Sequence, residues 1–279
     1  MIASIHQISS EGIRAARVFA AASEAGALLA LALLLGSCTA GPAPQGGSSS
    51  PSRVQAIPSA TLQLVTGVSE SWNSPRAQLQ LWERSGPGQR WEPVLPRPVP
   101  ALLGRSGSGW GRGLLQARRP GDPVKREGDG RAPAGAFALG SILGNDPALP
   151  PGSRYPYRQV TRWDTWIDDV NHPLYNQHVV VDPRQVPAWY ESQKMRQGDF
   201  AYRWLVDIRH NRDQPVAGAG SAIFFHVRRG PDRFTSGCTT MAESDLQKMV
   251  TWLRAEARPA YVLLPLAQYE QLRSPWNLP

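Results

Sequence analysis

The chain has few cysteines and no apolar run long enough to cross a membrane. Cys38 and Cys238 are its only two cysteines among 279 residues, which excludes a framework of several disulfides and leaves one possible bridge. The small and apolar run near the N-terminus, residues 25–35, covers eleven residues, too few for a transmembrane helix. If Cys38 is modified, Cys238 is a free thiol in an oxidising compartment, which suggests that this thiol has a chemical function.

The N-terminal region has the pattern of an export signal. Arg14 and Arg17 precede the apolar run, and the four residues Leu-Gly-Ser-Cys at 35–38 resemble the lipobox of bacterial lipoproteins. We therefore predict a lipoprotein-type signal peptide at residues 1–37 and lipidation of Cys38. Such an anchor would hold an exported, periplasmic domain on a bacterial membrane, expected to be the outer one, and would exclude a bridge to Cys238. A cleaved signal with an incidental cysteine and a buried amphipathic helix are the alternatives.

The charge balance is strongly basic, with a formal net charge of +8. A basic surface favours anionic partners. The arginines are scattered and are not clustered with aromatic residues, so nucleic acid is not expected as a partner. An anionic cell-wall polymer suits an exported chain better, although a generally arginine-rich composition explains the charge equally well.

The composition divides the chain after the signal into a tether and one domain. Residues 38–59 are rich in Gly, Pro and Ser, contain one charge and have little to build a core, so they are predicted to be flexible. Residues 60–279 show no second linker, no internal repeat and no LysM-like wall-binding module. We expect them to form a single catalytic domain.

That domain is predicted to be mainly β, with one or two short helices. Apolar and polar residues alternate at 61–66 and 77–82, which indicates two half-buried strands and an early hairpin. Further short strands are predicted at 91–95, 99–103, 136–139, 178–181, 201–209, 222–227 and 260–264. Gly and Pro, 26 of each, separate these segments.

The two predicted helices cover residues 186–196 and a segment that follows Cys238. The second has a capping-box pattern at 240–243 and one apolar stripe formed by Leu246, Met249, Val250 and Leu253. If this helix begins near Thr240, Cys238 lies at its N-terminal end, where the helix dipole favours a thiolate.

Cys238 and His226 form a candidate nucleophile and base. His226 ends the predicted strand 222–227, twelve residues before the cysteine, and a loop could bring the two side chains together. The histidine could accept the thiol proton and return it to a leaving amine. The amides of Gly237 and Cys238 would be oxyanion-hole donors. The alternative on these residues alone is a small buried cysteine and a core histidine whose hydrogen bonds are satisfied.

Several motifs resemble one bacterial cell-wall family. The strand-borne His226 followed by Ser236-Gly237-Cys238 is similar to the signature of the L,D-transpeptidase catalytic domain of the YkuD type. Residues 129–137 look like that family's Asp-Gly-Lys/Arg-Thr-Pro-x-Gly-x-Phe turn. Segments at 157–161, 166–169, 175–176 and 220–227 extend the likeness over about residues 61–264.

The resemblance implies a β-sandwich-like fold and an enzyme that acts on peptidoglycan stem peptides. No cofactor is expected, because acyl transfer by a thiol needs neither a metal nor a nucleotide. Cys238 would be the nucleophile and His226 the base, with Ser236 and Gly237 lining the nucleophile turn and the oxyanion region. The thioester would pass to an amine of another stem peptide. A stem-peptide hydrolase and an inactive, lipid-anchored wall-binding protein are the alternatives.

The sequence also departs from the family pattern. Thr240 stands where many members have an arginine, so we considered Arg228, Arg229 and Arg233 as substitutes for carboxylate recognition, or as a solvated basic loop. No metal site is predicted, because His172 and His178 lack a neighbouring ligand pattern. The glycine-rich stretch 129–135 lacks the Gly-Lys-Ser/Thr ending of a phosphate loop and is interpreted as a turn.

Overall fold

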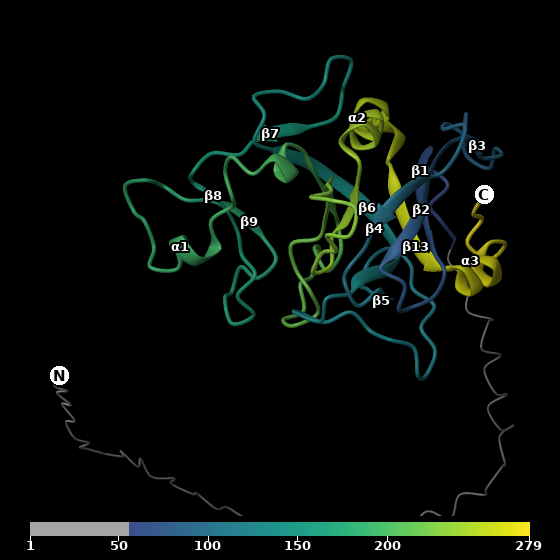
Figure 1. Cartoon of the computed structure of the whole chain (residues 1–279), viewed down its shortest axis with the longest axis horizontal. Coiled ribbons are helices and arrows are strands. Elements are labelled where there is room, and N and C mark those ends of the chain that lie inside the picture. The colour runs from purple at the N-terminus through teal and green to yellow at the C-terminus, as the bar shows by residue number, and fades with distance from the viewer. Residues whose placement is uncertain (1–55) are drawn as a thin grey trace, which may run out of the picture. The chain divides into compact units, whose positions relative to one another are not determined.

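The computed structural model describes residues 56–279; the predicted signal peptide, Cys38 and most of the predicted tether lie outside this range. Strands dominate the described part (Figure 1). They are β1 (Gln63–Ser69), β2 (Arg76–Glu83), β3 (Glu92–Pro93), β4 (Val99–Leu102), β5 (Ser108–Trp110), β6 (Ala132–Gly144), β7 (Tyr157–Gln159), β8 (Asp164–Trp166), β9 (His178–Val180), β10 (Leu205–Ile208), β11 (Phe224–Val227), β12 (Thr239–Met241) and β13 (Ala260–Pro265). The helices are α1 (Tyr190–Gln193), α2 (Glu243–Trp252) and α3 (Leu266–Leu272), with 3₁₀ turns η1 (Phe200–Tyr202) and η2 (Ala255–Ala257).

The predicted N-terminal hairpin is confirmed. β1 and β2 pair antiparallel, with Leu64 opposite Trp82 and Gly67 opposite Leu79. β2 also pairs with β4, and the order from β1 runs through β13, β6, β10, β11, β12 and β4 to β2. Because β2 returns to β1, these eight strands form a ladder that closes on itself. The mainly β prediction is therefore confirmed, with the sheet wrapped around a core.

The period of two along the strands explains why both faces of this sheet are buried. In β13, Tyr261 and Leu263 belong to the core inside the closed ladder, together with Phe225 and α2. Val262 and Leu264 point the other way, into a second cluster that includes Leu272, Trp276 and Leu278 of the C-terminal segment. Alternating side chains on a strand face opposite sides of a sheet, so one strand can supply two cores. The helix α3, which was not predicted, covers this outer face.

The helix after Cys238 begins later than predicted. Thr239–Met241 form the strand β12, and α2 starts at Glu243 after an Ala242 N-cap whose side chain makes no capping hydrogen bond. The capping-box interpretation of Thr240 is therefore wrong, because pairing with β11 and β4 takes these residues into the sheet. The apolar stripe is confirmed, since Leu246, Met249, Val250 and Leu253 are all buried.

Other predicted boundaries also change. The helix predicted at 186–196 is reduced to the single turn α1, and the strand predicted at 201–209 is limited to β10 because η1 occupies its start. The pair β8–β9 forms a separate two-stranded sheet that lies with α1 beside the large sheet in Figure 1. Within residues 56–279, no helix is both long and apolar enough for a membrane span.

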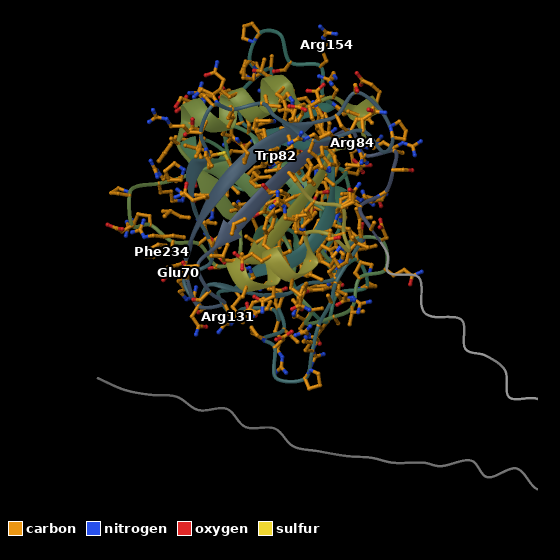
Figure 2. All side chains as sticks on the ribbon, turned by 90° about the vertical axis from the view of Figure 1, so that its right-hand side faces the viewer. Glu70, Trp82, Arg84, Arg131, Arg154 and Phe234 are labelled. Atoms are coloured by element: carbon orange, nitrogen blue, oxygen red, sulfur yellow. The ribbon has the colours of Figure 1, made fainter. Side chains whose placement is uncertain are left out.

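The loops that precede Cys238 and β6 meet at one end of the large sheet. Figure 2 shows Phe234 and Arg131, which belong to these loops, toward the same end as Glu70, and Arg154 toward the other. The main chains of Thr235 and Gly104 form an isolated parallel bridge there, which ties the loop before Cys238 to the segment after β4.

The packing of α2 can be tested with a matched pair of leucines. Leu246 lies on the buried face of α2 and is 0% exposed, whereas Leu266 at the start of α3 is 48% exposed. We expect Leu246→Ala to lower the free energy of unfolding by about 2–5 kcal/mol, because it leaves a cavity. Leu266→Ala should change it by less than about 0.5 kcal/mol. Urea denaturation measures both, and equal effects would contradict the assignment of α2 to the core.

Candidate active site

The pairing of β11 with β12 brings the candidate nucleophile and base to one place. The two strands run parallel, with Phe225 opposite Thr239 and His226 opposite Thr240. Cys238 comes directly before β12, so it lies near the beginning of β11 while His226 lies near its end. Both residues line the same cleft, which has a volume of about 520 Å³. The structure thus brings together the pair that the sequence predicted.

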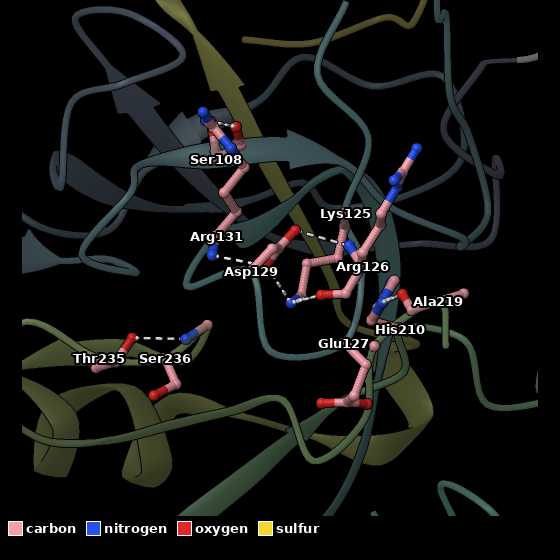
Figure 3. Close-up of polar contacts among 12 residues, drawn as sticks. Ser108, Lys125, Arg126, Glu127, Asp129, Arg131, His210, Ala219, Thr235 and Ser236 are labelled. Carbon is pink, nitrogen blue, oxygen red and sulfur yellow. Dashed lines mark hydrogen bonds and ion pairs between the residues drawn. The ribbon is translucent and has the colours of Figure 1, made fainter. Parts of the chain in front are cut away.

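A compact hydrogen-bonded turn presents the cysteine. The Thr235 hydroxyl donates to the Cys238 carbonyl oxygen at 2.6 Å and accepts from the Gly237 amide at 3.1 Å. The Arg105 amide donates to the Thr235 carbonyl at 2.9 Å, and the Arg105 guanidinium donates to the Ser236 hydroxyl at 3.2 Å. Figure 3 shows Thr235 and Ser236 in this turn. The backbone around the thiol is therefore held before any substrate binds.

A side chain at Gly237 would be crowded by its neighbours, and the Gly237 amide is already engaged. A Cβ at this position would lie 2.9 Å from Ile223 Cδ1 and 3.1 Å from the Arg131 carbonyl oxygen. Because the Gly237 amide donates to the Thr235 hydroxyl, it is not free to act as an oxyanion donor in this structure. Of the two predicted donors, the Cys238 amide remains the candidate.

The Cys238 thiol is held in a largely apolar setting. The residue is half-buried and packs against the cluster that contains Phe224 and Trp166, and its Sγ donates to the Ala222 carbonyl oxygen at 3.5 Å. Burial raises the pKa of the thiol to about 11, while a backbone hydrogen bond from Phe224 and the charge of Lys125 act in the lowering direction. The predicted activation by a helix N-terminus is wrong, because a strand follows the cysteine.

His226 is arranged as a neutral base. Its Nδ1 lies 2.9 Å from the Val227 carbonyl oxygen, and because a carbonyl only accepts, the ring proton is on Nδ1 and Nε2 keeps its lone pair. Burial lowers the pKa of His226 to about 4. The Tyr202 ring packs edge-on against the imidazole with centroids 5.3 Å apart. At neutral pH the resting pair is therefore a thiol and an imidazole rather than an ion pair.

The carbonyl that accepts from the thiol belongs to a strained residue. Ala222 has a φ of 54°, in the left-handed region that a non-glycine residue rarely adopts. The Asn176 side chain holds it there: its Oδ1 accepts from the Ala222 amide at 3.1 Å, and its Nδ2 donates to the His210 and Asn211 carbonyls. Strain of this kind persists where surrounding contacts fix it, and it clusters at functional sites.

The model of the L,D-transpeptidase catalytic domain, YkuD, matches residues 73–262 of this sequence. The chain belongs to that family. The matched range includes the turn, both strands of the candidate pair and every residue that lines the cleft. The family implies peptidoglycan as the substrate of a cell-wall enzyme. Comparisons with curated proteins and with solved structures find no match to this chain.

The residues predicted to bind the substrate of this L,D-transpeptidase-family domain differ in placement. Arg229 and Arg233 line the cleft, whereas Arg228 does not. Arg229 forms an ion pair with Asp199, its Nη1 donating at 2.8 Å, and lies over the Tyr202 ring, so its charge is partly neutralised. Arg233 makes no ion pair within residues 56–279 and is the better placed arginine.

Thr240 cannot take the place of the arginine that many L,D-transpeptidases carry. It is 1% exposed, and its hydroxyl donates to the Leu102 carbonyl oxygen at 3.4 Å. The assignment of Thr240 as a substrate-binding residue is therefore wrong, because β12 places this side chain inside the sheet between β11 and β4.

Sequence reasoning missed most of the residues that line the cleft, among them Lys125, Glu127, Asp168, Arg196 and Tyr202. Lys125 and Glu127 directly precede the recognised motif at 129–137, which is the one signal that could have found them. Glu127 and Asp168 give the cleft acidic groups as well as arginines, and burial raises the pKa of Asp168. Tyr202 and Arg196 come from the segment around η1, and nothing in the local pattern links that segment to the cleft.

The two histidines considered as metal ligands have other partners. His178 Nε2 lies 2.8 Å from Asp164 Oδ1, and His172 Nδ1 accepts from the Leu174 amide at 3.0 Å. In residues 56–279, no group of three or more His, Cys, Asp or Glu side chains is arranged to hold a metal ion.

The buried state of His226 predicts a pH dependence of stability. Its pKa is lowered from 6.5 to about 4, so between these values the unfolded chain binds a proton that the folded chain does not. The contribution is present above pH 6.5 and is lost as the pH falls toward 4, by up to about 3 kcal/mol. Unfolding free energies from pH 7 to 4 should therefore fall less steeply in His226→Asn than in the wild type. Parallel curves would contradict the buried, neutral histidine.

Proposed function

We propose that this protein is a cysteine-dependent acyltransferase that acts on peptidoglycan stem peptides. The observation that carries the proposal is the cleft shared by a thiol and a neutral histidine, Cys238 and His226, within a domain of the L,D-transpeptidase family. The unprotonated Nε2 of His226 supports a role as general base. The apolar walls around the sulfur support attack by a thiolate that forms only during the reaction.

The proposed reaction has two halves. In the first, His226 Nε2 accepts the thiol proton while Sγ forms a bond to a stem-peptide carbonyl carbon, expected to be that of the L-centre of diaminopimelate. The carbon–nitrogen bond to D-alanine then breaks, and His226 returns the proton to the leaving amine. In the second half, an acceptor amine attacks the thioester, its proton passes to His226, and the thiol re-forms.

The cleft suits a substrate that carries both charges. Arg196 and Arg233 lie on its wall together with Glu127 and Asp168, so a ligand with a carboxylate and an ammonium group finds a partner for each. A stem peptide that contains diaminopimelate has both groups. Arg229 contributes less, because Asp199 already binds its guanidinium.

Product analysis tests the proposal. The full-length protein is incubated with purified disaccharide-tetrapeptide, and the products are identified by mass spectrometry beside Cys238→Ala and His226→Asn. We expect dimers that lack one D-alanine, none with Cys238→Ala, and a rate about 10²–10⁴-fold lower with His226→Asn.

Two other outcomes distinguish the alternatives. Tripeptide without dimers would assign the protein as a hydrolase in which water resolves the thioester. If the wild type and Cys238→Ala leave every stem peptide unchanged, the enzymatic proposal fails and a wall-binding role is left.

A further inference from the structure

A buried lysine lies behind the turn that carries Cys238. The Lys125 side chain is 2% exposed, and it comes from the segment between β5 and β6. Its Cε lies 3.7 Å from the position of a Cβ on Gly237 and 3.0 Å from one on Gly220. The absence of a side chain at Gly220 leaves room for the lysine, which also passes beside Gly237. Lys125 thereby reaches the cleft that Cys238 lines.

The ammonium group of Lys125 is oriented by two hydrogen bonds. Nζ donates to Asp129 Oδ1 at 2.6 Å and to the Arg126 carbonyl oxygen at 2.5 Å, as Figure 3 shows. Asp129 is held in turn by the amides of Arg126 and Arg131, at 2.7 and 2.9 Å. An ammonium has three N–H groups, so one remains without a partner among residues 56–279.

The turn that carries Cys238 has few groups to stabilise negative charge on the sulfur, and the ammonium group of Lys125 is placed to do so. Burial disfavours a thiolate at Cys238, and α2 begins too late in the chain to offset it. The Gly237 amide is engaged with Thr235. Lys125 is the cation whose charge acts on the thiol in the lowering direction. Preorganised charge in a site with little water is worth more than the same charge in solution.

We propose that Lys125 supplies the positive charge that stabilises the Cys238 thiolate and the oxyanion formed when it attacks. The proton moves from Sγ to His226, the negative charge passes from sulfur to the carbonyl oxygen, and Lys125 stays protonated throughout. Asp129 is a positioning residue that aims the ammonium group. The oxyanion part rests on the proposed function, whereas the effect on the thiolate does not.

Alkylation of the thiol by iodoacetamide tests this proposal without any peptidoglycan substrate. The rate is measured against pH in the full chain carrying Cys38→Ser, so that Cys238 is the one reacting cysteine. Lys125→Met should make alkylation at pH 8 about tenfold slower, because the thiolate fraction falls tenfold for each pH unit by which the pKa rises. Lys125→Arg should retain most of the rate. Lys248→Met, which removes a lysine that is 58% exposed on α2, is the matched control and should not change it.

Asp129→Asn gives a second test with the same sign. Its Nδ2 cannot accept from the Arg126 amide, so the turn that aims the ammonium group is weakened and alkylation at pH 8 should become slower. Melting temperatures of all variants are recorded in parallel. A lower melting temperature in Lys125→Met with an unchanged pH profile would show a purely structural role and overturn the proposal. Unchanged alkylation in both Lys125→Met and Asp129→Asn would overturn it as well.

Failure here and failure of the proposed function are distinguishable. If Lys125→Met leaves the pH profile unchanged while the wild type still forms dimers from tetrapeptide, only the role of Lys125 is lost. If Lys125→Met shifts the pH profile of alkylation as expected while the wild type processes no stem peptide, the effect of Lys125 on the thiol stands and the proposed acyl transfer fails.

Discussion

The parallel pairing of β11 with β12 is the constraint on which the site depends. It places His226 opposite Thr240 and leaves Cys238 at the open end of the short ladder, beside the start of β11. The closed sheet supports this pair from both sides, because β10 pairs with β11 and β4 pairs with β12. The thirteen-residue strand β6, two strands away from β11, follows the turn whose Arg131 carbonyl limits the space at Gly237. The strand pairing of the closed sheet therefore itself positions the two candidate catalytic residues.

The electrostatics of the cleft favour chemistry that begins from neutral groups. Burial raises the pKa of Cys238 and lowers that of His226, so both act against a resting thiolate–imidazolium pair. A thiol kept protonated is protected from oxidation, since the thiolate is the form that oxidises readily. Activation then requires a substrate carbonyl in place, a base with a free Nε2, and a fixed positive charge. Lys125 is the group whose position meets the last requirement.

The sequence predicted several strands and the cysteine and histidine that line the cleft, but not the elements and residues around them. Alternation along β1, β2 and β13 and the apolar stripe of α2 follow directly from side-chain periodicity. The cysteine and histidine could be found because nucleophile and base carry distinctive side chains. The start of α2 could not be predicted, since Thr240 and Glu243 fit a local capping pattern. In the structure Thr240 instead pairs with Leu102 of β4, more than a hundred residues earlier in the sequence. Lys125 was missed for a similar reason: it is buried beside two glycines, Gly220 and Gly237, that lie far along the chain.

The central claim is that Cys238 carries the acyl group, and the intact mass of the protein during turnover tests it most directly. The full chain is mixed with disaccharide-tetrapeptide, quenched in acid within seconds and weighed by mass spectrometry. The account predicts an added mass equal to the substrate minus D-alanine, located on the peptide that contains Cys238 and released by hydroxylamine. Cys238→Ala should show no such addition. Stem-peptide turnover by Cys238→Ala, or an acyl group on any residue other than Cys238, would contradict the account.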